Sequence, residues 1–126
     1  MAIGVNKVIL IGHLGGDPEV RHTSGDLAVT KFSLATSEVH TAKDGSRETK
    51  TEWHRIVAFG TLANICGEFL KKGSMVYVEG KLRTSDWKDQ KGNRRFTTEV
   101  IASSMQMLDR KDATAQPLET SNEDDA

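Results

Sequence analysis

The sequence predicts an all-β fold with one helix, a five-stranded barrel in the order β-β-β-α-β-β. Two observations carry this prediction: segments rich in β-branched and aromatic residues recur along the chain, and a single segment shows helical spacing of apolar residues. Glycines inside the strand segments suit a strongly curved sheet. The 126 residues are the length of one domain, and no internal repeat is visible.

The strand segments show alternating side chains, and we place them at 5–14, 28–39, 51–60, 75–84 and 96–107. In the first segment, alternation puts Leu10 on one face and Ile9 and Ile11 on the other. Apolar residues on both faces predict a strand covered on one side by the core and on the other by another subunit.

The helix is predicted over 62–72, where apolar residues follow one stripe (Leu62, Ile65, Cys66, Phe69 and Leu70). Thr61 is the expected N-cap, and Gly73 is expected to end the helix in a left-handed conformation. Cys66 lies on the apolar stripe, which favours a core position over a nucleophile.

Polar segments with turn residues predict the connections. We expect a turn over 15–20, a hairpin loop over 40–50, and a polar loop with its turn at 91–93. A five-stranded barrel with a helix after the third strand is the oligonucleotide-binding (OB) arrangement.

Charge is divided unevenly along the chain. Residues 1–111 contain all 17 basic residues and 13 acidic residues, a balance of +4, whereas residues 112–126 contain five acidic residues and no basic one. That last segment has few apolar residues and no aromatic one, so it cannot bury enough surface to offset the entropy of ordering. We therefore expect a folded domain over 1–109 and a disordered acidic tail over 110–126.

Several function classes lack their motifs in this sequence. It has no GxxxxGK[ST], HExxH, CxxC or GxSxG pattern, and no two of its four histidines have zinc-ligand spacing. We therefore expect no metal, no cofactor and no catalytic residue. The longest apolar runs fall short of the ~18 residues of a membrane span, no signal-peptide pattern is present, and a lone cysteine fits a reducing compartment.

The third strand carries the most informative side chains. Alternation puts Trp53, Arg55, Val57 and Phe59 on one face and His54 on the other. Bases stack on aromatic rings whatever their identity, and arginine adds charge or cation–π contact. An arginine between two rings argues against a purely buried face, because unpaired arginines are seldom buried.

A second patch surrounds Trp87, which stands in a polar segment with basic neighbours (Arg83, Lys88, Lys91, Arg94 and Arg95). A tryptophan in so polar a segment has little core to join, which favours exposure for binding. Aromatic residues interleaved with basic ones suit an unpaired nucleic-acid strand. Proteins that read a duplex need a helix or ribbon shaped for a groove.

The segments GVNKVILIGHLGGDPEVR, FSLATSE, TEWHRIVAFG, LKKGSMVYVEGKLRT, TTEV and MQML resemble, in this order, the bacterial and mitochondrial single-stranded DNA-binding protein family. The resemblance runs from about Gly4 to Leu108. It implies an OB fold assembled into a homotetramer around which single-stranded DNA wraps. It also implies a non-enzymatic, sequence-independent role in protecting DNA during replication, recombination and repair, in the bacterial cytoplasm and associated with the nucleoid.

The resemblance also implies roles for individual residues. Trp53, Phe59 and Trp87 correspond to its stacking rings, and His40 stands where many members have a further tryptophan. Phosphate contacts are expected from basic positions (Lys7, Arg55, Lys72, Arg83, Lys88, Arg94 and Arg95). His54 and Tyr77 are expected at a subunit interface.

The family's acidic tip recruits replication and repair proteins. Here Glu123, Asp124 and Asp125 supply the acidity, without the family's terminal hydrophobic dipeptide. The uneven charge also suggests the hypothesis that the acidic tail competes with DNA for the basic residues of the folded domain. Two other functions stay open: a primosome-assembly protein with the same barrel that contacts a helicase, and a small nuclease built on Glu52, His54 and a metal ion.

Overall fold

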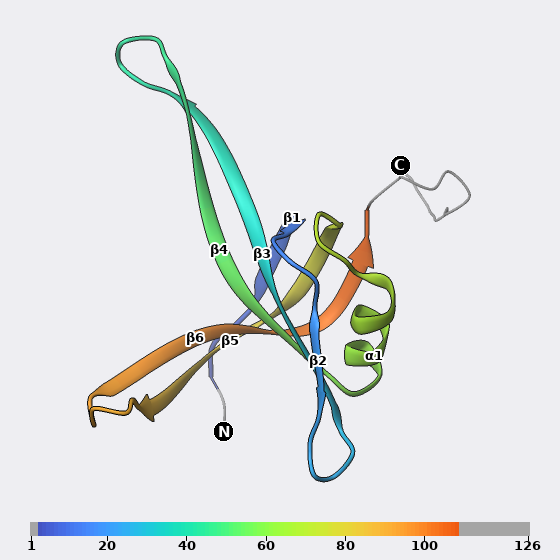
Figure 1. The fold of residues 1–126 in the computed structure, drawn as a ribbon. Helices are drawn as coiled ribbons and strands as arrows, with labels where there is room; N and C mark the ends of the chain where they lie inside the picture. The colour runs from blue at the N-terminus through green and yellow to red at the C-terminus, as the bar shows by residue number, and fades with distance from the viewer. Residues whose placement is uncertain (1–2, 109–126) are drawn as a thin grey trace.

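The computed structural model describes residues 3–108 of the chain, so the predicted tail over 110–126 lies outside the described residues. The elements, in chain order, are β1 (Val8–Leu14), β2 (Glu19–His22), β3 (Ala28–Thr41), β4 (Arg47–Phe59), α1 (Gly60–Phe69), β5 (Met75–Lys88) and β6 (Arg94–Met107). Two long hairpins, β3–β4 and β5–β6, project from a small barrel (Figure 1).

The barrel closes because β1 pairs with both β5 and β3. The strand order around it is β1-β5-β6-β4-β3, with β4 and β6 parallel and the other pairs antiparallel. The predicted five-stranded barrel with one helix after its third strand is confirmed.

The short strand β2 is an addition to that prediction. We expected a turn over 15–20, but Glu19–His22 pairs with β3 at the edge of the sheet, with Glu19 opposite Lys31 and His22 opposite Ala28. All four β2 residues are exposed, so the segment lacks the alternation that would have predicted a strand.

The core lies inside the barrel and under α1. Leu34, Ile56, Val76 and Val78 have no exposed surface, and α1 contributes Ala63 and Cys66. Burial raises the pKa of the Cys66 thiol to about 11, so this group stays protonated near neutral pH and is a poor nucleophile. The predicted core position of Cys66 is confirmed.

The helix is displaced toward the N-terminus from its predicted bounds, 62–72. It begins at Gly60, with Phe59 rather than Thr61 in the N-cap position and no side-chain cap. It ends at Phe69, because Leu70 turns into extended backbone and buries its side chain in the core. In the part of the chain that the structure describes, no helix is long and apolar enough to cross a membrane.

Gly73 does adopt the expected left-handed φ of +89°, but in the turn after the helix rather than at its end. Tertiary hydrogen bonds hold that turn: the Lys72 backbone N–H donates to Asp17 Oδ1 at 2.9 Å, and the Gly73 N–H donates to the Leu14 carbonyl at 2.9 Å. These bonds take up the N–H groups that a longer helix would have used.

The two predicted polar loops are mostly strand. Instead of a loop over 40–50, β3 runs to Thr41 and β4 begins at Arg47; the polar segment around Trp87 likewise belongs to β5 and β6. Each hairpin is closed by a five-residue turn, Ala42–Ser46 or Asp89–Asn93, with the same pair of backbone hydrogen bonds. Polar cross-strand pairs replace the hydrophobic alternation that would have predicted strands here.

Glycines make the tight closure of the barrel possible. A side chain at Gly12 would place its Cβ 2.2 Å from the Ala35 carbonyl oxygen, and one at Gly80 would place it 2.1 Å from the Ile101 oxygen. Gly80 also lies at the irregularity in the β5–β6 register. The expected glycine positions within a curved sheet are therefore points of close backbone approach.

Candidate nucleic-acid interface

Strand β4 presents its predicted faces. Ile56 and Ala58 have no exposed surface and join the core, whereas Trp53 is 63% exposed on the opposite, outer face. Arg55 is also exposed and Phe59 is half-buried, while Val57 on the same face is covered by its neighbours. An indole, a guanidinium and a phenyl ring thus follow one another along the outside of the barrel.

The indole of Trp53 lies against the backbone of Gly15. A Cβ added at Gly15 would stand 2.4 Å from Cζ3 of the ring, so the glycine leaves the space that the ring occupies. Trp53 and Arg55 line a groove together with residues of both signs of charge, among them Asp17, Glu19, Lys31 and Glu99.

The outer face of β4 continues onto the β5–β6 hairpin. The Arg83 guanidinium lies 5.8 Å from the centroid of the Phe59 ring, and its Nη2 is 3.5 Å from Glu99 Oε1. Side chains alternate between the two faces along β5, so Ser85 and Trp87 lie on the same face as Arg83. We call this continuous surface the ring track; its members are Trp53, Arg55, Phe59, Arg83 and Trp87.

Trp87 is 48% exposed, and its orientation is fixed by a hydrogen bond from the indole Nε1–H to Thr97 Oγ1 at 2.8 Å. Arg95 is opposite Trp87 in the strand register. The Arg95 Nε donates to Asp89 Oδ2 at 3.0 Å. The pKa of Asp89 is lowered, chiefly by the hydrogen bond from the Asn93 backbone N–H and further by Arg95.

Several predicted phosphate-binding cations already have a carboxylate partner. Arg94 donates from Nε to Asp86 Oδ2 at 2.9 Å, an interaction that raises the pKa of the guanidinium. Lys7 Nζ lies 3.2 Å from Glu79 Oε2 of β5. Arg55, by contrast, forms no ion pair among residues 3–108.

Two predicted phosphate contacts, Lys88 and Arg94, stand opposite each other in the register and lie on the face of the β5–β6 hairpin that faces away from Trp87. Lys72 follows the helix, where its backbone is bonded to Asp17 at the rim of the groove. Of the predicted cations, the structure therefore brings Arg55, Arg83 and Arg95 together with the rings.

His40 lies on the opposite face of the β3–β4 hairpin from Trp53. Its register partner is Glu48, whose Oε1 is 3.1 Å from His40 Nε2. The residue that shares the Trp53 face at this level is Val39, which is 60% exposed. A stacking role for His40 stays a prediction, and the structure separates it from the ring track.

Sequence reasoning passed over Phe96, which is 65% exposed on β6. A signal was present, because Phe96 stands in the same polar, arginine-rich hairpin as Trp87 and directly follows Arg94 and Arg95. It was missed because its place in the hairpin depends on the register of β5 and β6.

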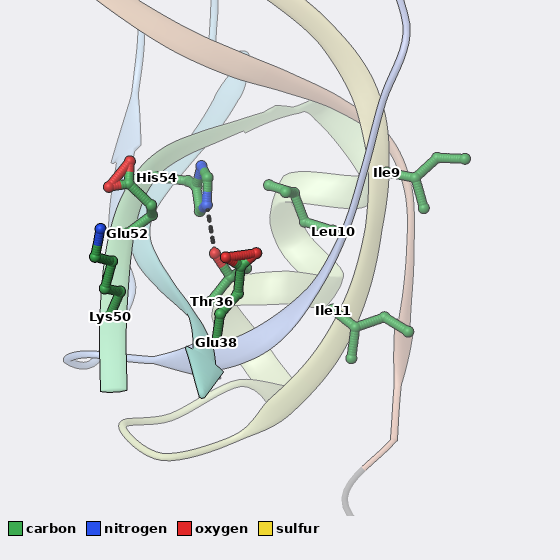
Figure 2. Close-up of a pocket in the computed structure, with 8 residues that line it drawn as sticks. All are labelled: Ile9, Leu10, Ile11, Thr36, Glu38, Lys50, Glu52 and His54. Carbon is green, nitrogen blue, oxygen red and sulfur yellow. Dashed lines mark hydrogen bonds between the residues drawn. The ribbon is translucent and has the colours of Figure 1, made fainter. Parts of the chain in front are cut away.

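The outer face of β1 forms a second surface. Ile9 and Ile11 are 56% and 51% exposed, and Figure 2 shows both pointing away from the side on which Leu10 and His54 lie. They line one pocket with polar residues of the β3–β4 hairpin (Thr36, Glu38, Lys50, Glu52 and His54). The His54 Nε2 lies 2.9 Å from Thr36 Oγ1, the bond drawn in Figure 2.

Tyr77 adjoins this surface, since Tyr77 is the register partner of Ile11. Its hydroxyl donates to Glu79 Oε1 at 2.9 Å. That bond raises the pKa of Tyr77. The same bond, followed by the interaction with Lys7, lowers the pKa of Glu79. Of the two predicted interface residues, Tyr77 therefore lies beside the exposed isoleucines of β1, whereas His54 lines the pocket from the side on which Leu10 lies.

Glu52 and His54 share a face of β4, as the nuclease hypothesis requires, but His54 is engaged with Thr36. In the stretch 3–108, no group of three or more His, Cys, Asp or Glu side chains is arranged to hold a metal ion.

Comparisons with known proteins identify the relatives of this chain. A single-stranded DNA-binding protein 1 from Chlorobaculum tepidum is 53% identical over 114 residues, which cover 90% of this chain and 70% of that protein. A single-stranded DNA-binding protein from Xanthomonas axonopodis pv. citri is 49% identical over 108 residues, which cover 86% of this chain and 60% of that protein.

Among solved structures, a Plasmodium falciparum SSB in complex with single-stranded DNA superposes with a TM-score of 0.80 at 33% identity, covering 86% of this chain and 99% of that one. A deletion mutant of the Thermus aquaticus single-stranded DNA binding protein gives a TM-score of 0.75 at 32% identity, covering 88% of this chain and 54% of that one. The model of the single-strand binding protein family matches residues 5–108. This chain belongs to the single-strand binding protein family.

Proposed function

We propose that this protein binds single-stranded DNA without sequence preference and without catalysing a reaction on it. The observation that carries the proposal is the ring track, in which exposed or half-exposed aromatic rings alternate with arginines along one outer surface. The names of the relatives, and the complex of the P. falciparum protein with single-stranded DNA, support the same ligand.

Binding combines two kinds of contact. Each base stacked on an aromatic ring contributes about 1–3 kcal/mol, whichever base it is. Each phosphate neutralised by lysine or arginine releases counterions, so log K falls by about 0.7 for every tenfold rise in salt per phosphate on a single strand. Arg55 is the cation best placed for this, because it stands between Trp53 and Phe59 without a carboxylate partner among the described residues.

The test is a gel-shift and fluorescence titration with a 5′-labelled oligo-dT in the presence of magnesium. We expect retardation of an intact oligonucleotide, with quenching of tryptophan fluorescence and an affinity that falls as salt rises. Cleavage of the oligonucleotide would support the nuclease alternative instead. Equal affinity for single-stranded and duplex DNA would contradict the proposed ligand.

The protein is further proposed to act as a homotetramer that uses the outer face of β1. Exposed Ile9 and Ile11, with Tyr77 beside Ile11, form an apolar surface of the kind that is buried between subunits, and His54 lines the adjoining pocket. Light scattering with and without poly-dT measures the subunit number and the stoichiometry together. We expect four chains, and a smaller assembly for Ile11→Glu; a wild-type protein that stays a monomer would contradict this assembly.

The cellular role we propose is protection of unpaired DNA during replication, recombination and repair, in the cytoplasm and near the nucleoid. The bacterial origin of the named relatives supports this setting.

Two hypotheses concern the acidic tail, which lies outside the described residues: that it recruits other proteins through Glu123, Asp124 and Asp125, and that it competes with DNA. Deleting residues 112–126 should tighten DNA binding most at low salt if the tail competes; equal affinities would end that hypothesis.

A further inference from the structure

The β5–β6 hairpin has two differently oriented faces beyond the barrel. In the register, Trp87 stands opposite Arg95, and one position along on each strand Asp86 stands opposite Phe96. Directly opposed residues of an antiparallel pair share a face, and neighbours along a strand alternate. Trp87 and Phe96 therefore point to opposite sides of the same hairpin.

The Phe96 face is open along the whole outer part of the hairpin. All of its side chains from the barrel outward are exposed (Leu82, Thr84, Asp86, Lys88, Arg94, Phe96 and Thr98). The Phe96 ring is 65% exposed, more than Trp53 or Trp87. An aromatic ring so far from any core adds nothing to the barrel interior, so its apolar surface is available to a ligand.

An arginine accompanies this ring as well. The Arg94 guanidinium lies 5.6 Å from the centroid of Phe96, and its bonds to Asp86 hold it there. The ring track has the same pairing, in which the Arg83 guanidinium lies 5.8 Å from the Phe59 centroid and is paired with Glu99.

The Phe96 face also has a small positive excess. Lys88 and Arg94 against Asp86 leave +1 on this face, whereas on the Trp87 face Arg83 and Arg95 are balanced by Glu99 and by Asp89, the partner of Arg95. A negatively charged backbone is therefore attracted to the Phe96 face at least as well as to the Trp87 face. Charge complementarity favours a nucleic-acid strand as the occupant of the Phe96 face over a second apolar surface.

We propose that Phe96 is a further base-stacking residue, and that the face of the hairpin opposite Trp87 binds single-stranded DNA. This inference rests on the proposed function. The ring takes a nucleobase of either class, and Arg94 and Lys88 contact the neighbouring phosphates. A sufficiently long strand then contacts both sides of the β5–β6 hairpin, whereas a short one occupies the ring track alone.

A direct test places a fluorescent reporter at position 96. Trp53→Phe and Trp87→Phe keep aromatic rings on the ring track and remove both natural tryptophans. Phe96→Trp in this background then carries the only indole, and its fluorescence should be quenched by a long oligo-dT at low salt. Phe69→Trp is the matched control, because Phe69 is 53% exposed on α1 rather than on the hairpin. Quenching equal to that of the control would overturn the inference.

Affinity measurements complement the reporter. For a long oligo-dT we expect Phe96→Ala and Phe96→Leu to weaken binding by about fivefold or more, the lower end for one stacked base, and Phe96→Tyr to bind like the wild type. For a short oligo-dT, Phe96→Ala should bind as the wild type does. If Phe96→Leu binds the long oligo-dT with wild-type affinity, no base stacks on the Phe96 ring and the inference is overturned.

The alternative occupant of the Phe96 face is a second copy of the chain in place of DNA. Light scattering of Phe96→Ala, with circular dichroism to verify folding, separates the two cases: an unchanged subunit number with weakened binding supports the DNA site, and a reduced subunit number overturns it. If Trp53→Ala and Trp87→Ala weaken binding while Phe96→Ala does not, this inference fails and the proposed function stands. If none of the three weakens binding, the proposed function itself fails.

Discussion

The two long hairpins share a construction but distribute their side chains differently. Both are closed by a five-residue turn with a glycine in its fourth position, φ +88° at Gly45 and +85° at Gly92. In each turn an aspartate accepts hydrogen bonds from the backbone: Asp44 from the Ser46 N–H, and Asp89 from the N–H groups of Lys91 and Asn93. The turns therefore do not account for the difference between the hairpins, which lies in the faces of the strands.

The β3–β4 hairpin confines its strand carboxylates to one face. The face that carries Trp53 has Arg47 and Arg55 and no carboxylate, while Glu38, Glu48 and Glu52 lie with Lys50 on the face that carries His54. The β5–β6 hairpin instead puts a ring, at least one arginine and at least one carboxylate on each of its faces. One hairpin therefore offers DNA a single face, and the other offers two.

The largest expected effect comes from removing the rings of the two hairpins. Trp53→Ala and Trp87→Ala should each weaken oligo-dT binding by about 1–3 kcal/mol, because each loses a stacked base. Fluorescence or gel-shift titration at low and high salt measures the change. Phe69→Ala on α1 serves as the control and should bind normally. Wild-type affinity in both tryptophan variants would refute the ring assignments.

A smaller effect should follow when Trp53 is displaced rather than removed. Gly15→Ala puts a methyl group where the indole now lies, so we expect binding to weaken by up to about 1 kcal/mol with a shifted emission maximum. Gly16→Ala is the matched control, since a Cβ there meets no atom within 4 Å. Equal affinities of the two variants would show that the position of the ring does not matter.

Charge removal tests whether ion pairing decides which arginines bind phosphate. Arg55→Ala should reduce the slope of log K against log salt by about 0.7, the value for one phosphate. Arg95→Ala should reduce it less, because Arg95 already holds Asp89 and releases fewer counterions. The measurement is a salt titration with oligo-dT. Identical slopes for the two variants would show that pairing with a carboxylate does not decide which arginine binds phosphate.

The smallest effect is expected from freeing the paired arginines. Asp86→Asn and Asp89→Asn remove the partners of Arg94 and Arg95 and should tighten binding by about twofold each, as exposed ion pairs are weak. Glu68→Gln makes the same change of net charge at an exposed position of α1. If Glu68→Gln tightens binding equally, net charge rather than pairing is responsible.

The low pKa of Asp89 also sets the pH at which its pairing with Arg95 ends. A carboxyl whose folded-state pKa is depressed contributes stability above its unfolded pKa, about 4, and loses that contribution as pH falls through the lower folded value. Asp44 and Glu79 have lowered values too. Thermal unfolding should therefore be insensitive to these groups between pH 5 and 8, and these contributions should be lost below about pH 4. Carboxyl titration by NMR provides the check.

The sequence predicted the barrel and the outer face of β4 because both depend on local alternation. Ile56 and Ala58 face the core, so a period of two was enough to put Trp53 and Arg55 outside. The outer halves of the hairpins have polar residues on both faces, which leaves no alternation to follow. In these parts, the register of the paired strands decides that His40 and Trp53 lie on opposite faces and that Phe96 is exposed. The turn at the end of each hairpin fixes that register.

The contact between Trp53 and the backbone of Gly15 has a consequence for the entropy of binding. Immobilising a freely rotating side chain costs about 0.5–1.5 kcal/mol when a ligand binds. The Trp53 indole already lies against the main chain of Gly15 in the free protein. Part of its rotational freedom is therefore given up during folding, so a base that stacks on it forfeits less of the interaction to ordering the ring.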